Sequence, residues 1–231
     1  LLGMAPEGEQ PVIKMKQYSR EFNAGQIGMV LVHANVSGDV TDSDPTNDDP
    51  AQNLKIIDSL ERNLNTVENA SAVSVVFLMK ATGLAPTISG QPLLTQIQEL
   101  PGYELLPEDV RNTFEILLDQ QITQGATFWD LLTTHVEFGL PGSTQSQIFL
   151  LDVFYASLTK ETREIFVSED FSRSLIYVDM PFIPVADTAK SVDSVNIKAA
   201  SFQGRYGESA EELTGVAATA IEVNELIVGS Q

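Results

Sequence analysis

The stretch IGMVLVHANV, residues 27–36, is a nearly continuous apolar run, which is typical of a β-strand. An amphipathic pattern follows around Pro50–Val67, and a second apolar run, Ala72–Met79, comes after it. Asp49 is placed to cap that helix, Pro50 suits its first position, and Gln52 stands where a capping box has its partner. The three segments predict a strand–helix–strand unit.

The same pattern occurs a second time near the C-terminal end of the chain. A strand is predicted at Ser174–Met180, a helix at Asp187–Phe202 and another strand at Leu213–Ala218. The apolar residues of both helices are spaced by three, three, four and three positions, which places each set on one helix face: Leu54, Ile57, Leu60, Leu64 and Val67 in the first, and Ala189, Val192, Val195, Ala199 and Phe202 in the second. The doubled βαβ unit predicts an α+β fold, a four-stranded sheet with helices on one face.

A long region of helical periodicity separates the two copies. One helix is predicted to open at Pro107-Glu108-Asp109, a second carries Phe128, and a short one at Thr159–Phe166 leads back to the sheet. The predicted organisation has four parts: a connector at 1–25 with a helix at Pro11–Phe22, a first βαβ half at 26–90, an all-helical insertion at 91–170, and a second βαβ half with a terminal helix at 171–231.

Composition excludes several classes of function. The net charge is −19 with only 13 Lys and Arg residues, which disfavours a nucleic-acid partner and anionic lipid head groups. The chain has no cysteine, so thiol catalysis, disulfides and thiolate metal sites are ruled out. It also has no apolar run of about 18 residues that would span a bilayer.

Candidate sites for metals and catalysis are weak. The acidic cluster Asp39, Asp42, Asp44, Asp48 and Asp49 suggests a calcium loop, but its spacing does not fit an EF-hand, so a capped, solvated loop is the better interpretation. We expect His33 to be buried and hydrogen-bonded, and His135 to lie on a helix without zinc-binding spacing. The chain has no nucleophile elbow and no glycine-rich phosphate loop. We therefore expect no enzyme activity, cofactor or metal.

Two features of the sequence bear on the cellular compartment in which the chain is located. Asn35-Val36-Ser37 and Asn69-Ala70-Ser71 both match the N-glycosylation acceptor rule, which favours an extracytoplasmic surface. The last segment, residues 219–231, has a helix-like pattern that is compatible with a chain leading toward a membrane span. A docked C-terminal helix of an independent protein is the alternative interpretation.

Four stretches of the chain, in this order, resemble the large extracytoplasmic loop of resistance–nodulation–division (RND) transporters, in the archaeal, MmpL-like and hopanoid-transporter-like branch. The first two are a strand with a Gly-Asp turn at Phe22–Asp39 and a helix and strand at Leu54–Lys80. The last two are a re-entry strand preceded by Asp170, at Phe166–Met180, and a final strand and helix at Leu213–Gln231. The helical region matches in character more than in residues, and none of the stretches is a catalytic signature.

The resemblance implies a ferredoxin-like βαβ-βαβ porter core on the extracytoplasmic face of the cell membrane. The implied partners are a sister porter domain, the transmembrane helices of the same polypeptide, further copies of the protomer, and a hydrophobic or lipidic substrate. It also implies a substrate path lined by Phe128, Trp129, Phe138 and Phe149, although a small helical core needs the same aromatic residues. The proton relay of such transporters lies in transmembrane helices outside this chain.

Two other classes of function stay open. One is an independent extracellular ligand-binding or protein-interaction domain with the same fold. The other is an enzyme whose site is dispersed over the helical region.

Overall fold

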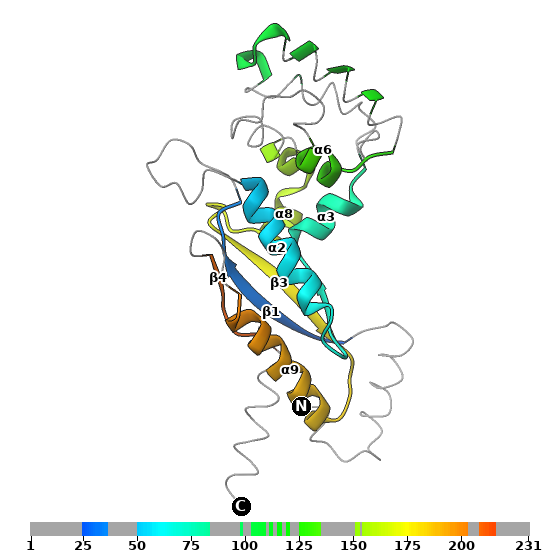
Figure 1. Cartoon of the computed structure of the whole chain (residues 1–231), viewed down its shortest axis with the longest axis vertical. Helices are drawn as coiled ribbons and strands as arrows, with labels where there is room; N and C mark the ends of the chain where they lie inside the picture. Colours follow the sequence, from blue (N-terminus) through cyan, green and yellow to red (C-terminus); the bar gives the residue numbers. More distant parts are fainter. Residues whose placement is uncertain are drawn as a thin grey trace, which may run out of the picture. The chain divides into compact units, whose positions relative to one another are not determined.

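The computed structural model describes residues 25–36, 50–83, 98, 103–109, 111–112, 115–116, 119–120, 125–134, 151–152, 154–202 and 208–215. The chain divides into two compact units. Figure 1 colours the chain along its sequence, from the N-terminus to the C-terminus. The sheet unit comprises Leu1–His33, Ile56–Ser74 and Ser174–Gln231; the helical unit comprises Ala34–Lys55 and Val75–Arg173. Among the described residues the fold is mixed α+β, as predicted.

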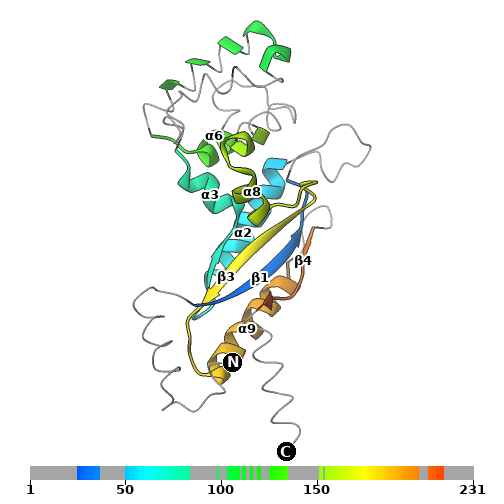
Figure 2. The same cartoon turned by 180° about the vertical axis from the view of Figure 1, so that it is seen from behind.

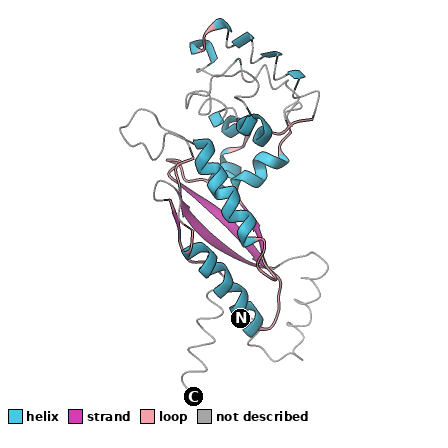
Figure 3. Cartoon of the chain, viewed as in Figure 1, coloured by secondary structure: helices cyan, strands magenta, loops and turns pink. Residues whose placement is uncertain are grey.

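The described part of the chain contains one five-stranded sheet (Figure 3), formed by β1 (Gln26–His33), β2 (Ser71–Val73), β3 (Arg173–Met180), β4 (Ser209–Ala210) and β5 (Thr214–Gly215). The strand order is β2-β3-β1-β4, and β5 also pairs with β1. Pairing is antiparallel between β2 and β3, with Ala72 opposite Val178, and between β1 and both β4 and β5. The predicted strands at 27–36 and 174–180 are therefore confirmed, although β1 ends at His33.

Two long helices pack on the sheet. Helix α2 (Pro50–Leu64) starts at the proline that the sequence predicts, and every residue of its predicted apolar face is buried. Helix α9 (Val185–Ala200) buries Val192, Val195 and Ala199. Lys198 Nζ donates to Asn63 Oδ1 at 2.7 Å, which places the two helices side by side. Seen from behind, β1 and β3 lie in front of α2 (Figure 2).

The prediction of a strand through Ala72–Met79 is wrong beyond Val73. Residues Val75–Ala81 form helix α3, in which Val75, Val76 and Met79 are buried at helical spacing. The strand ends at Val73, and the next residue, Ser74, is fully buried and donates from both its backbone N–H and its hydroxyl to the Glu61 carboxylate of α2. Because Ser74 bonds to a helix side chain instead of a neighbouring strand, the backbone leaves the sheet there and the apolar run continues as a helix.

The remaining described elements are short. They are a 3-10 helix η3 (Tyr103–Leu105), helix α6 (Phe128–Thr134) and helix α8 (Lys160–Phe166). Helix α8 was predicted, and Thr159 caps it by accepting from the Thr162 N–H at 3.2 Å. Several predicted features lie outside the described residues: the helix at Pro11–Phe22, the acidic loop at 39–49, His135, and the segment 219–231.

The side chain of Asn65 covers the outer edge of β2, which is an edge strand of the sheet. Asn65 accepts from the Ala72 N–H at 2.8 Å and donates to the Ala72 carbonyl at 3.0 Å. The amide thus makes the two bonds that a neighbouring strand would make with this residue. Since Ala72 is buried, water cannot replace those bonds easily, and the edge is protected against pairing with another chain.

Strand β5 approaches β1 very closely. The backbone of Gly215 has φ of +108°, and a Cβ at this position would lie 2.9 Å from the Ile27 carbonyl oxygen. On the facing strand, Gly28 leaves room for the Leu213 side chain, which would lie 2.7 Å from a Cβ. Leu213 is held by its N–H, which donates to Asn196 Oδ1 at 2.8 Å. The strand predicted at Leu213–Ala218 therefore begins at Thr214, and residues beyond Gly215 lie outside the described part.

We predict that Asn65→Ala lowers the free energy of unfolding by about 1–2 kcal/mol, because the buried N–H and carbonyl of Ala72 lose their partners. Urea denaturation measures the loss. Asn63→Ala, two residues earlier in the last turn of α2, removes only an exposed bond to Lys198 and should cost less than about 0.5 kcal/mol. Equal losses in the two variants would contradict the role given to Asn65.

We also predict that Gly215→Ala destabilises the chain more than Gly125→Ala does. Both glycines have positive φ, so both variants suffer backbone strain of about 1–2 kcal/mol. A Cβ at Gly125 meets no atom within 4 Å, whereas one at Gly215 also collides with the Ile27 backbone. Urea denaturation of both variants makes the comparison, and a larger loss in Gly125→Ala would show that the close approach of β5 is wrong.

Candidate functional site

Helix α6 carries the first two residues of the predicted substrate path, and its start is firmly fixed. Asp130 Oδ2 accepts from the Thr127 N–H at 2.9 Å, and Thr127 Oγ1 accepts from the Asp130 N–H at 3.2 Å. This reciprocal arrangement caps the helix. The Phe128 N–H then donates to the Thr82 carbonyl at 3.1 Å, which joins α6 to the end of α3. The positions of Phe128 and Trp129 relative to α3 follow from these bonds.

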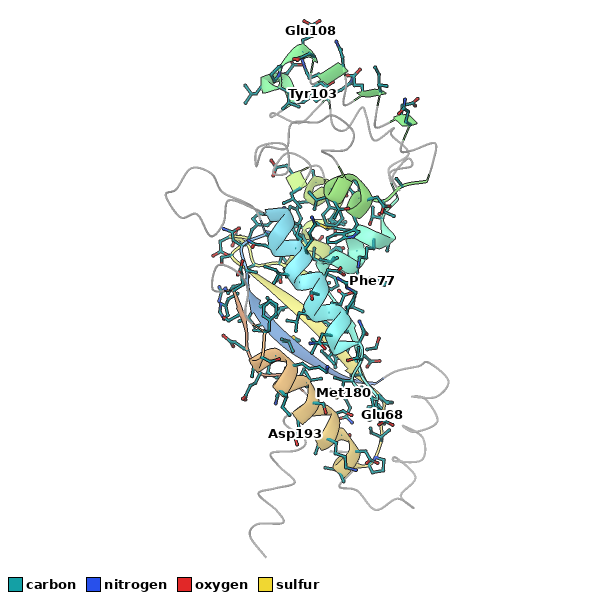
Figure 4. All side chains as sticks on the ribbon, viewed as in Figure 1. Glu68, Phe77, Tyr103, Glu108, Met180 and Asp193 are labelled. Atoms are coloured by element: carbon teal, nitrogen blue, oxygen red, sulfur yellow. The ribbon has the colours of Figure 1, made fainter. Side chains whose placement is uncertain are left out.

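We give the name Trp129 patch to three residues, Trp129 of α6 together with Phe77 and Lys80, which lie three positions apart on α3. The Lys80 ammonium lies 5.2 Å from the centre of the Trp129 ring, within the range of a cation–π interaction. Trp129 is half-buried, and Phe77 (labelled in Figure 4) is 48% exposed. The patch therefore offers apolar ring surface beside one amine. Such a surface suits a hydrophobic molecule with an acidic group.

Phe128 has different surroundings. It is only 3% exposed and begins a row of rings, with centres 5.3 Å apart from Phe128 to Phe154, 5.5 Å from Phe154 to Tyr155 and 4.9 Å from Tyr155 to Phe171. Edge-on and tilted contacts of this kind stabilise a core. Phe128 thus packs in the core of the helical unit. Phe138 and Phe149 lie outside the described residues.

Tyr155 fixes this row to the backbone. Its hydroxyl lies 3.4 Å from the Val36 carbonyl, and the Val36 N–H donates to the Phe171 carbonyl at 3.0 Å. Burial, with the nearby negative charge of Asp152, raises the pKa of Tyr155 far above its ordinary range. The hydroxyl therefore stays protonated, and its role is structural.

A polar pocket of about 440 Å³ lies elsewhere in the helical unit, lined by Gln98, Tyr103, Glu104, Glu108, Arg111, Asn112 and Glu115 (Tyr103 and Glu108 are labelled in Figure 4). Arg111 pairs with Glu104 at 3.3 Å, and its guanidinium lies 5.8 Å from the centre of the Tyr103 ring. Glu115 accepts from the Tyr103 hydroxyl and from Gln98 Nε2. These two bonds, the tyrosine's first, lower the pKa of Glu115, whereas burial raises the pKa of Tyr103.

The sequence pattern did not predict this pocket, although it contains one indication of it. Arg111 is the only lysine or arginine between Lys80 and Lys160, a region that contains many carboxylates. A lone cation in so acidic a region is expected to gather acidic partners around it.

The two histidine predictions have different outcomes. His33 is hydrogen-bonded as expected, because its Nε2 lies 2.7 Å from Glu211 Oε1, but its side chain is 42% exposed, so the prediction that it is buried is wrong. It lies on the face of β1 turned away from the buried Val30 and Val32, since side chains alternate along a strand. Among the described residues, no group of three or more His, Cys, Asp or Glu side chains is arranged to hold a metal ion.

Asp170, the residue that precedes the re-entry strand, organises a tight turn. Its Oδ1 accepts from the Ser168 hydroxyl at 2.6 Å, from the Ser172 hydroxyl at 2.8 Å and from the Ser172 N–H at 3.1 Å. The next residue, Phe171, has φ of +57°. These hydrogen bonds, led by that from Ser168, lower the pKa of Asp170 to about 2.

No family model, curated protein or solved structure matches this chain. In the described part, no helix is both long enough and apolar enough to cross a membrane. The residues and their geometry are therefore the basis for inferring a function.

We predict that Asp170→Asn lowers stability at neutral pH and that the difference from the wild type shrinks in acid. The folded pKa lies below the unfolded one, so the carboxylate's contribution is complete above about pH 4 and is lost as pH falls toward 2. Urea denaturation from pH 7 to pH 3 measures this. Glu169→Gln removes the same charge from the neighbouring residue, and a matching pH-dependent gap in that variant would contradict the prediction.

Proposed function

We propose that this chain is an extracytoplasmic loop domain of an RND-type membrane transporter, in which it forms part of the path or gate for hydrophobic or lipidic molecules. The observation that supports this most is the strand order β2-β3-β1-β4. The domain itself carries out no chemistry. Its role is to bind or admit substrate and to move as a body when the membrane helices rearrange.

The strand order of the sheet supports a ferredoxin-like porter core. In the first βαβ unit, β1 and β2 are not neighbours, because β3 lies between them. In the second unit, β1 lies in the same way between β3 and β4. Two split βαβ units that interleave are the arrangement of a ferredoxin-like sheet. The elements that interleave are also those that carry the resemblance to RND loops.

A contact with a sister porter domain is proposed for the sheet face that does not carry α2 and α9. This face presents Ile27, which is 53% exposed, together with half-buried Met29, Leu31, Leu175 and Tyr177. Apolar side chains on an exposed face favour contact with another protein surface. Such a contact would bury Ile27 without disturbing the helices on the other face.

The Trp129 patch is the proposed place of substrate contact. Phe77 and Trp129 supply apolar surface from two packed helices, and Lys80 supplies the positive charge beside it. Binding would cover ring surface that water now contacts, which favours association with an amphiphile. The buried row from Phe128 to Phe171 would hold α6 in place while this happens.

We predict that a single-chain anionic amphiphile, added below its critical micelle concentration, changes the fluorescence of Trp129 in a saturable way. Trp129 is the only tryptophan, so the signal reports on this patch alone. Phe77→Ala and Lys80→Gln should each weaken binding about three- to tenfold, which corresponds to about 0.7–1.4 kcal/mol.

Two matched variants control for general hydrophobic and electrostatic effects. Ile165→Ala removes an exposed apolar side chain from α8, and Lys160→Gln removes an exposed positive charge from the same helix. Equal weakening in these variants, or no saturable signal at all, would count against the patch.

The reading frame around this segment in its source gene separates a transporter loop from an independent binding protein. Apolar spans of about 20 residues on both sides support the transporter. A stop codon directly after Gln231, with a signal peptide upstream, would overturn it even if Trp129 responds to amphiphile.

A further inference from the structure

The two N-glycosylation motifs of the sequence lie in very different surroundings. Asn69 is exposed, in the turn between α2 and β2, with φ of +60°. Its side chain makes no hydrogen bond within the described part of the chain. Ser71, the third residue of the motif, is also exposed, at the first position of the edge strand β2. Both side chains that an oligosaccharyltransferase must contact are thus available on the folded surface.

The turn that presents Asn69 is itself well fixed. The Ala70 N–H donates to the Val67 carbonyl at 3.2 Å, and the Glu68 carbonyl accepts from Ser191 Oγ of α9 at 2.8 Å. Val67 is buried beneath the turn. A sugar on Asn69 would extend from this turn without displacing any of these contacts.

Asn35 lies in a packed segment instead. Its carbonyl accepts from Asn53 Nδ2, and the next residue, Val36, is fully buried. The N–H and carbonyl of Val36 bond to Phe171 and Tyr155 in the aromatic core. An enzyme that contacts the Asn35 motif would have to pull the buried Val36 out of that core.

We propose that Asn69 is an N-glycosylation site and that Asn35 carries no glycan in the folded protein. The donor is a lipid-linked oligosaccharide. The Asn69 Nδ2 forms a bond to C1 of its first sugar, the C1–O bond to the lipid phosphate breaks with its electron pair going to the phosphate oxygen, and the amide nitrogen loses one proton. In the native cell this modification rests on the extracytoplasmic location of the proposed function.

A glycan at Asn69 has a structural consequence for the sheet. β2 is the edge strand of the sheet, and the outward-facing backbone N–H and carbonyl of Ala72 are already bonded to Asn65. A bulky, solvated sugar two residues before this strand would keep other chains away from the edge. It would also require the α2–β2 turn to face solvent, so a sister domain would have to bind elsewhere.

The test is to express the full chain behind a secretion leader in a host that performs N-glycosylation, and to map glycans on the folded, secreted fraction by mass spectrometry. We expect one glycan, at Asn69, in the wild type and in Asn35→Gln. Ser71→Ala should lose it while keeping the asparagine in its turn, and Ser71→Thr should retain it.

A folded fraction with a glycan on Asn35, or with none on Asn69, overturns the inference. Retention of the glycan in Ser71→Ala does so as well. Because the leader determines the route of the chain, the outcome is independent of the transporter proposal, which the source reading frame tests separately. Either proposal is therefore able to fail while the other stands.

Discussion

The pairing of β1 with β3 is the constraint on which the rest of the sheet unit depends. These two strands belong to different βαβ units and are separated along the chain by the whole helical region. Neither βαβ unit forms a sheet alone, because its own strands do not touch. The chain must therefore close a long loop before α2 and α9 gain a surface to pack on, and such non-local pairing slows folding.

The sequence predicted those elements whose pattern matches a single environment. The buried face of α2 from Leu54 to Leu64 was predicted residue by residue, as was the burial of Val67 just after the helix, because one helix face is buried along its whole length. The run Val75–Met79 was misread because a short apolar run suits a strand and a buried helix equally. What decides between them is the bond between Ser74 and Glu61, which lie thirteen residues apart. Periodicity carries no information about such a contact.

In the candidate site, too, the sequence pattern predicted some features, and others depend on contacts between distant residues. The sequence identified Trp129 as one of the aromatic residues of α6 but gave no means of separating it from Phe128, although only Trp129 reaches the surface. Lys80 came next to Trp129 only through the packing of α3 on α6, and α3 had been predicted as a strand. His33 was expected to be buried because its neighbours are apolar. Its position on the outward face of β1 follows from strand alternation, and its bond to Glu211 from the pairing of β1 with β4.

The isolation of Arg111 gives the helical unit an unusual response to trypsin. Trypsin cleaves after lysine and arginine, and Arg111 is the only such residue between Lys80 and Lys160. Its side chain is 29% exposed and is held by Glu104 and the Tyr103 ring, so the protease must draw it out of these contacts before cleaving. Cleavage after Arg111 would therefore require local opening of the polar pocket. The rate of that cleavage in the native protein would report how often this region unfolds.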